Sequence, residues 1–151
     1  MRRKSIKTTQ DAGNKHANVR KEHSTETAQD YVEAIDDLIG EHGICRLVEI
    51  ARHFAVSHVT ANRTVARLKR DGLVQSDPYG PITLTSAGKR LANASRQRHE
   101  IVLNFLKALG VNAETAANDA EGIEHHVSQE TLDAMLRFTA ERAAVANNAN
   151  S

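Results

Sequence analysis

The chain has 151 residues, a formal net charge of +1, one cysteine and no tryptophan. This length suits one domain or two small ones and argues against a large catalytic fold. One cysteine excludes an internal disulfide framework, and no apolar run approaches the length of a membrane span. We therefore expect a cytoplasmic protein with no membrane partner. The low aromatic content argues against single-strand nucleic acid binding, which uses exposed aromatic platforms.

The net charge hides a division of the chain into four blocks of alternating sign. Residues 1–22 carry +5, residues 23–45 carry −6, residues 46–98 carry +7 and residues 99–151 carry −5. This pattern favours a basic middle module that binds a polyanion, flanked by two acidic segments that can share cations.

The first block, residues 1–22, lacks apolar periodicity and is predicted to be a disordered basic tail. Such a tail is either a solubilising extension or an arm that contacts phosphates, and the residues favour neither. Apolar residues at helical spacing then predict a helix from about Thr25 to Ile39. This helix carries Asp30 and Glu33, spaced i, i+3, beside its apolar stripe.

Residues 44–75 have the pattern of a helix-turn-helix. A short helix with Leu47 and Phe54 is followed by a tight turn, and Ser57 is well placed as the N-cap of a second helix that ends before Gly72. The second helix carries polar residues early and basic residues later, as a recognition helix requires for reading base edges and contacting phosphates. The predicted contacts to double-stranded DNA are Ser57, His58, Thr60, Asn62, Arg63, Arg67 and Arg70.

Two short strands around the turn at residues 77–80, with Pro78 at its second position, predict a hairpin after the recognition helix. A hairpin in this place is a wing. The alternative is an ordinary small α+β domain whose helix pair merely packs. The basic block and the order of helix, helix and hairpin favour the winged helix-turn-helix.

Three further helices are predicted, over residues 86–109, from about Asn112 to His126, and after Ser128 as N-cap. They hold more apolar positions than a unit of this size can bury. We therefore expect them to pair with a second copy of the chain in a homodimer. The end of the chain, residues 146–151, is rich in alanine and asparagine and is expected to fray.

The segment from Glu121 to His126 carries metal-ligand chemistry. Glu121, Glu124 and His125 are spaced i, i+3, i+4, so they are neighbours on a helix. Two carboxylates and an imidazole repel one another and are poorly solvated unless a cation lies between them. The alternative is a solvated acidic helix face, which is common in soluble proteins.

Asp30, Glu33 and His99 enlarge this set to four carboxylates and two imidazoles from three helices. Oxygen-rich sets with imidazole suit Mn²⁺ or Fe²⁺, and the absence of thiolates disfavours a soft zinc cage. Together with the winged helix, these motifs and Arg98-His99-Glu100 resemble the manganese-responsive regulators of the DtxR family of metalloregulators. The resemblance covers residues 25–140.

The resemblance implies a set of ligands: Asp30, Glu33, His99, Glu121, Glu124 and His125. It implies two Mn²⁺ ions per subunit, bridged by carboxylates, and it implies that the neighbouring His126 is not a principal ligand. The iron-responsive branch of the family has a methionine in place of Asp30 and a cysteine in place of Glu121. Hard oxygen ligands at both positions favour Mn²⁺, which gains little from sulfur.

We therefore predict a mostly α-helical chain with a winged helix-turn-helix over residues 23–92 and a helical dimerisation and metal-binding domain over residues 93–145. The predicted function is Mn²⁺-activated repression of manganese uptake genes through a palindromic operator, with activation of other genes left open. No catalytic residue and no small organic substrate is predicted, because the chain lacks His-Glu-x-x-His and paired Glu-x-x-His motifs. The alternatives are an iron- or zinc-responsive regulator of the same family, or a winged-helix regulator whose Glu/His cluster is structural.

Overall fold

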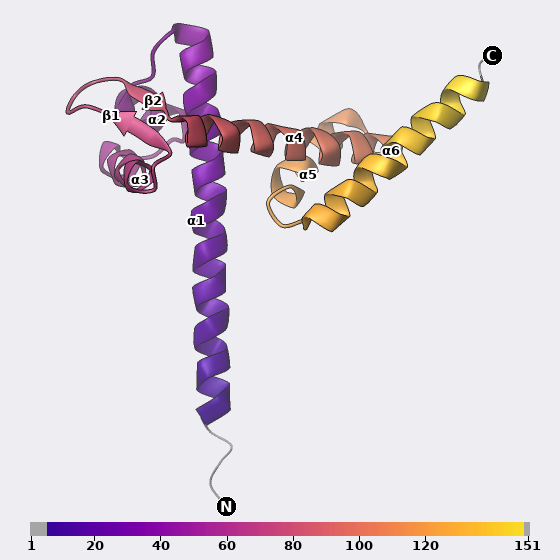
Figure 1. Cartoon of the computed structure of the whole chain (residues 1–151), viewed down its shortest axis with the longest axis horizontal. Helices are drawn as coiled ribbons and strands as arrows, with labels where there is room; N and C mark the ends of the chain where they lie inside the picture. The colour runs from indigo at the N-terminus through magenta and orange to yellow at the C-terminus, as the bar shows by residue number, and fades with distance from the viewer. Residues whose placement is uncertain (1–5, 150–151) are drawn as a thin grey trace, which may run out of the picture. The chain divides into compact units, whose positions relative to one another are not determined.

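The computed structural model of the chain describes residues 6–149 and contains six helices and a two-stranded sheet within them (Figure 1). The elements are α1 (Ile6–His42), α2 (Leu47–His53), α3 (His58–Arg70), β1 (Val74–Ser76), β2 (Ile82–Leu84), α4 (Ser86–Ala108), α5 (Ala113–Ile123) and α6 (Gln129–Ala149). The chain divides into two compact units, Met1–Lys89 and Arg90–Ser151, whose boundary falls within α4. The predicted mostly α-helical class, with its small hairpin, is confirmed.

Helix α1 is longer than the sequence predicts, because it begins at Ile6 rather than near Thr25. The prediction of a disordered tail is therefore wrong for residues 6–22, and residues 1–5 lie outside the described part of the chain. Residues 6–24 contain no proline and several good helix formers, so a helix that starts in the packed region can propagate through them without an apolar stripe. Likewise, α6 extends to Ala149, beyond the point where fraying was expected.

The later half of α1 belongs to the core of the first unit. Val32 and Ile35 are fully buried, and α1 packs on α2 and β2. The ring of Tyr31 stacks on Phe54, which follows α2, with centroids 4.1 Å apart and planes 3° from parallel. These contacts fix α1 to the helix-turn-helix, so a movement of α1 also moves the DNA-reading part of this unit.

The helix-turn-helix and wing form as predicted. Ser57 caps α3 by accepting a hydrogen bond from the Thr60 backbone N–H at 3.1 Å. Strands β1 and β2 pair antiparallel, with Gln75 opposite Thr83. The Lys69 ammonium donates to the Ser76 carbonyl at 2.6 Å and so ties the wing to α3.

The start of α4 is packed tightly against the strand that leads into the wing. Thr85 Oγ1 accepts from the Gly88 backbone N–H at 3.0 Å and donates to the Gly72 carbonyl at 2.7 Å. A Cβ at Gly88 would lie 2.1 Å from the Leu73 carbonyl oxygen, which is far inside van der Waals contact. The crossing of these two segments therefore requires glycine at this position.

The second unit is built on a small core of Val102, Ala120 and Leu132, contributed by α4, α5 and α6. Asn112 and Ser128 cap α5 and α6 by accepting backbone N–H groups at 3.0 and 3.2 Å. Several large apolar side chains of this unit stay exposed, as expected for a surface that binds a second copy: Leu109, Leu136 and Val145. Among the described helices, none has the length and apolar character needed to cross a membrane.

Candidate metal centre and DNA-contacting surface

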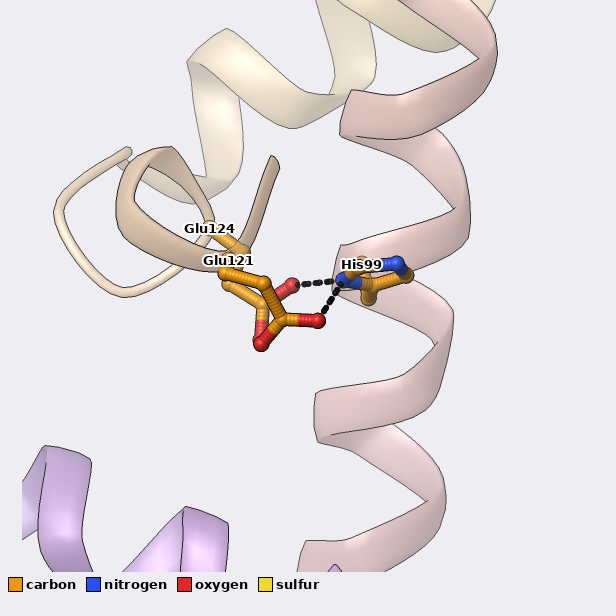
Figure 2. Close-up of side chains that lie close together, drawn as sticks. All are labelled: His99, Glu121 and Glu124. Carbon is orange, nitrogen blue, oxygen red and sulfur yellow. Dashed lines mark hydrogen bonds and ion pairs between the residues drawn. The ribbon is translucent and has the colours of Figure 1, made fainter. Parts of the chain in front are cut away.

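Three of the predicted ligands meet in the second unit. His99 lies midway along α4, Glu121 lies in the last turn of α5, and Glu124 is the C-cap residue of α5 (Figure 2). His99 Nδ1 is 2.6 Å from Glu124 Oε2 and 3.6 Å from Glu121 Oε1. One ligand atom from each residue lies within 4.8 Å of the other two. Two carboxylate oxygens and one imidazole nitrogen at this spacing fit a hard or borderline divalent cation.

Glu124 is the unusual member of this cluster, because the residue is only 4% exposed. Burial raises the pKa of Glu124, and the Glu121 carboxylate adds to the increase, although His99 and His125 oppose it. A buried carboxylate is unfavourable unless positive charge or hydrogen-bond donors surround it. His99 Nδ1 donates a side-chain hydrogen bond to Glu124 Oε2 at 2.6 Å.

Arg98 holds the backbone that carries Glu124. Its Nε and Nη2 donate to the Glu124 carbonyl at 3.1 and 2.6 Å, and Nη2 also donates to the Val127 carbonyl at 2.7 Å. These bonds give hydrogen-bond donors to two carbonyls in the connection between α5 and α6. The Arg98-His99-Glu100 motif is visible in the sequence, but it did not predict this role for Arg98. Its place next to His99 was the only signal for one.

The remaining predicted ligands are placed as follows. Helix α5 ends at Ile123, so the three ligands near its end do not all share a helical face, although Glu124 keeps helical backbone angles. His125 follows in the turn, its Nε2 3.6 Å from Glu124 Oε1. Asp30 and Glu33 lie one turn apart on α1, which belongs to the first unit. These three residues stay predicted ligands, and His126 is exposed.

The predicted DNA-contacting residues lie on or next to α3, and most of them are exposed. His58, Asn62 and Arg63 form the early exposed part of the helix, and Arg70 is exposed at its end. Arg67 differs, because its Nε and Nη2 are buried without a hydrogen-bond partner. Two of its nitrogens are therefore turned away from solvent, and contact of Arg67 with DNA stays a prediction.

Comparison with known families agrees with this division into two units. Residues 23–82 match the iron dependent repressor family's N-terminal DNA binding domain, and residues 85–143 match its metal binding and dimerisation domain. The chain belongs to the DtxR family of iron-dependent repressors. Its residues therefore include a DNA-binding domain followed by a domain for metal binding and dimerisation.

Individual relatives in the family carry more specific names. The transcriptional regulator MntR of Salmonella typhimurium is 51% identical over 121 residues, which make up 80% of this chain and 77% of that protein. The HTH-type transcriptional regulator MntR of Bacillus subtilis is 37% identical over 110 residues, or 73% of this chain and 78% of that protein. The predicted resemblance to the manganese-responsive members of the family is confirmed.

A solved structure has a similar fold. The structure of a manganese-dependent transcriptional repressor in complex with manganese has a TM-score of 0.62 and is 31% identical, over 77% of this chain and 52% of that chain. The present chain therefore spans about half the length of that solved repressor. The likeness supports the order of a winged-helix unit followed by a helical unit.

Proposed function

We propose that the chain is a Mn²⁺-activated transcriptional repressor of manganese uptake genes, which acts in the cytoplasm as a homodimer on a palindromic operator. The observation that carries this proposal is the cluster of His99, Glu121 and Glu124 in a domain of the metal-binding and dimerisation type. The choice of metal is supported by the similar solved structure, which is named a manganese-dependent transcriptional repressor in complex with manganese. Its activity is regulated binding of DNA and not catalysis.

The ligand set supports Mn²⁺ over softer metals. His99, Glu121 and Glu124 contain no sulfur, and burial raises the pKa of the Glu124 carboxyl group, which a bound cation would oppose. We propose that Asp30, Glu33 and His125 complete the set, with two ions per subunit, on the basis of their spacing and the family resemblance. His99 Nδ1 faces both carboxylates, so it must lose its proton before it can serve as a ligand.

Activation follows from the charges of these residues and from the packing of α1. Asp30, Glu33, Glu121 and Glu124 carry up to four negative charges, and their repulsion opposes one shared site. A bound divalent cation supplies the positive charge that offsets this repulsion. Asp30 and Glu33 belong to the helix that Tyr31 and Val32 pack into the winged-helix unit. When Asp30 and Glu33 bind the cation, the movement of the winged-helix unit is restricted. This also restricts the spacing of the two recognition helices of the dimer, which must fit successive major grooves.

Two alternatives make different predictions. An iron- or zinc-responsive regulator would use the same ligands, because ligand type biases the choice among divalent metals without fixing it. A winged-helix regulator with a structural Glu/His cluster would bind DNA without any metal response.

The test is DNA affinity measured against free Mn²⁺, Fe²⁺ and Zn²⁺. The probe is a duplex selected from a randomised pool by the wild-type protein in Mn²⁺. We expect Mn²⁺ to raise affinity for this duplex by about a hundredfold, within the usual range of coupling between two sites. Reciprocally, the duplex should tighten Mn²⁺ binding by the same factor. The proposal would be overturned if a chelator left the affinity for the duplex unchanged. If Fe²⁺ or Zn²⁺ raised this affinity more than Mn²⁺ does, that ion would be the activating metal.

A further inference from the structure

The tip of the wing carries a strained and fully exposed tyrosine. Tyr79 is the third residue of the turn from Asp77 to Gly80, which closes with a hydrogen bond from the Gly80 N–H to the Asp77 carbonyl at 2.9 Å. Its φ is +60° and its side chain is 103% exposed. Glycine or asparagine is favoured at this turn position, because a Cβ is disfavoured at positive φ. An exposed aromatic ring there makes no contact that offsets the strain.

The wing and the recognition helix enclose a groove beside this tyrosine. The groove has a volume of about 830 Å³ and is lined by His58, Val59 and Asn62 of α3 and by Pro78 and Tyr79 of the wing. The lining of the groove is partly apolar and partly polar. Val59, which is 60% exposed, contributes apolar surface, and His58 and Asn62 contribute polar groups. The Lys69 ammonium, which also lines the groove, bonds the Ser76 carbonyl and so links α3 to β1.

The charges around the groove favour an anionic occupant. Arg46 and Lys69 line it together with His58, against a single acidic residue, Asp77. Arg46 is exposed and therefore free to reach an external phosphate. A sugar-phosphate chain combines an anion with apolar sugar faces, and it therefore matches both the basic and the apolar parts of this lining.

We propose that Tyr79 is a further DNA-contacting residue, outside the recognition helix, whose ring packs on the sugar-phosphate backbone beside the major groove that receives α3. Arg46 then contacts a phosphate of the same backbone segment. The backbone strain at Tyr79 is retained because it holds the ring outward toward the duplex. Tyrosine suits this place, since its ring supplies apolar contact while its hydroxyl can donate to a phosphate oxygen. This inference rests on the DNA-binding function of the first unit and adds a contact outside the recognition helix.

The decisive variant is Tyr79→Gly, because it should move fold stability and DNA affinity in opposite directions. Glycine relieves the strain at positive φ, so the melting temperature should rise by about 2 to 4 °C. Loss of the ring should weaken binding of the selected duplex about tenfold in saturating Mn²⁺, as should Tyr79→Ala. Tyr79→Phe keeps the ring and should stay within about threefold of wild type. A ring that merely stabilised the wing would lower stability and affinity together.

Two further variants make the test specific. Ala55→Gly relieves a similar strain, at φ +51° in the turn between α2 and α3. It should raise stability and leave DNA affinity unchanged. Arg46→Ala should lower the slope of log affinity against log salt by about one, whereas Tyr79→Ala should leave that slope unchanged because no charge is lost.

The proposal is overturned if Tyr79→Gly and Tyr79→Ala bind the selected duplex as tightly as wild type, or if Tyr79→Gly lowers stability along with affinity. Neither result would affect the proposed function, which is tested by the binding of wild-type protein to the same duplex.

Discussion

The two units of the chain differ in what fills their interiors. Among residues whose burial is described, fifteen of the twenty buried hydrophobic side chains lie in the winged-helix unit and five in the helical unit. The helical unit also contains the two buried polar residues found in the described part of the chain, Ser95 and Glu124. The first unit can therefore be stable through its own core, whereas the second depends on groups from outside itself.

This difference assigns the two units separate tasks. A rigid hydrophobic core suits the presentation of a recognition helix, which must keep its shape when it meets DNA. A small core around a buried carboxylate suits a sensor, because its stability can then depend strongly on whether a cation and a second copy are bound. The predictions below probe one unit or the other.

The largest effect should come from Glu124→Gln. The amide cannot supply the charge that a divalent cation requires, so the Mn²⁺-dependent gain in DNA affinity, about a hundredfold in wild type, should disappear. The metal-free variant should be at least as stable as wild type, because glutamine removes a carboxylate whose pKa burial raises. Thermal melts with and without Mn²⁺ and DNA titrations measure both effects.

Glu121→Gln is the matched control for that experiment, because the Glu121 side chain is 72% exposed. It should weaken the metal response without raising the stability of the metal-free protein. A Glu124→Gln protein that still responds to Mn²⁺ would remove Glu124 from the ligand set and leave the cluster as a structural feature.

The second prediction concerns the core of the first unit. Gly88→Ala should lower the free energy of unfolding by about 3 kcal/mol, because its Cβ would meet the Leu73 carbonyl at 2.1 Å and force backbone to move. Gly40→Ala is the control, since Gly40 lies within α1 with no atom near its Cβ position. It should raise stability by about 0.5 to 1 kcal/mol, as alanine does in helices. Equal effects in denaturant unfolding would show that α4 does not cross the wing so closely.

Much of the fold follows from local signals in the sequence. Ser57, Asn112 and Ser128 are cap residues, and the structure uses each of them as a cap. The turn containing Pro78 likewise predicted the wing. The start of α1 could not be predicted in this way, because it depends on helix propagation from a packed segment and has no stop signal. Helical periodicity identifies helices that carry an apolar stripe, and the sequence of residues 6–24 carries none.

The residue types of the candidate metal centre could be predicted from the sequence, but their arrangement could not. The spacing of Glu121, Glu124 and His125 indicated ligands, and His99 came from the joint pattern of motifs. No pattern indicated that α5 would end at Ile123, so that Glu124 is buried while Glu121 stays exposed. Long-range contacts such as the bonds from Arg98 to the Glu124 and Val127 carbonyls have no sequence period at all.

A third prediction concerns Arg98. Arg98→Lys keeps the charge but loses the fork of donors that bonds both carbonyls. We expect Mn²⁺ affinity to fall about tenfold, the lower end of what outer partners of metal ligands contribute. The exposed Arg137 on α6 is the control, and Arg137→Lys should have no effect. Isothermal titration with Mn²⁺ distinguishes the two, and equal affinities would limit Arg98 to a structural role.

The smallest effect should come from Cys45, which is fully buried in the first unit. Burial raises the pKa of its thiol from 9.0 to about 12, and the nearby Glu49 carboxylate adds to the increase. Its folded pKa is raised, so the thiol's contribution to stability is complete below pH 9 and is lost as pH rises toward 12, at about 1.4 kcal/mol per pH unit. Lysines and tyrosines titrate in the same range, so the measurement is the difference in unfolding free energy between wild type and Cys45→Ala from pH 8 to 10. That difference should be constant at the lower end and shrink above pH 9. A difference that stays constant throughout would mean that the thiol ionises as readily in the folded chain as in the unfolded one, and the core of the first unit would then be more open to water than its buried side chains indicate.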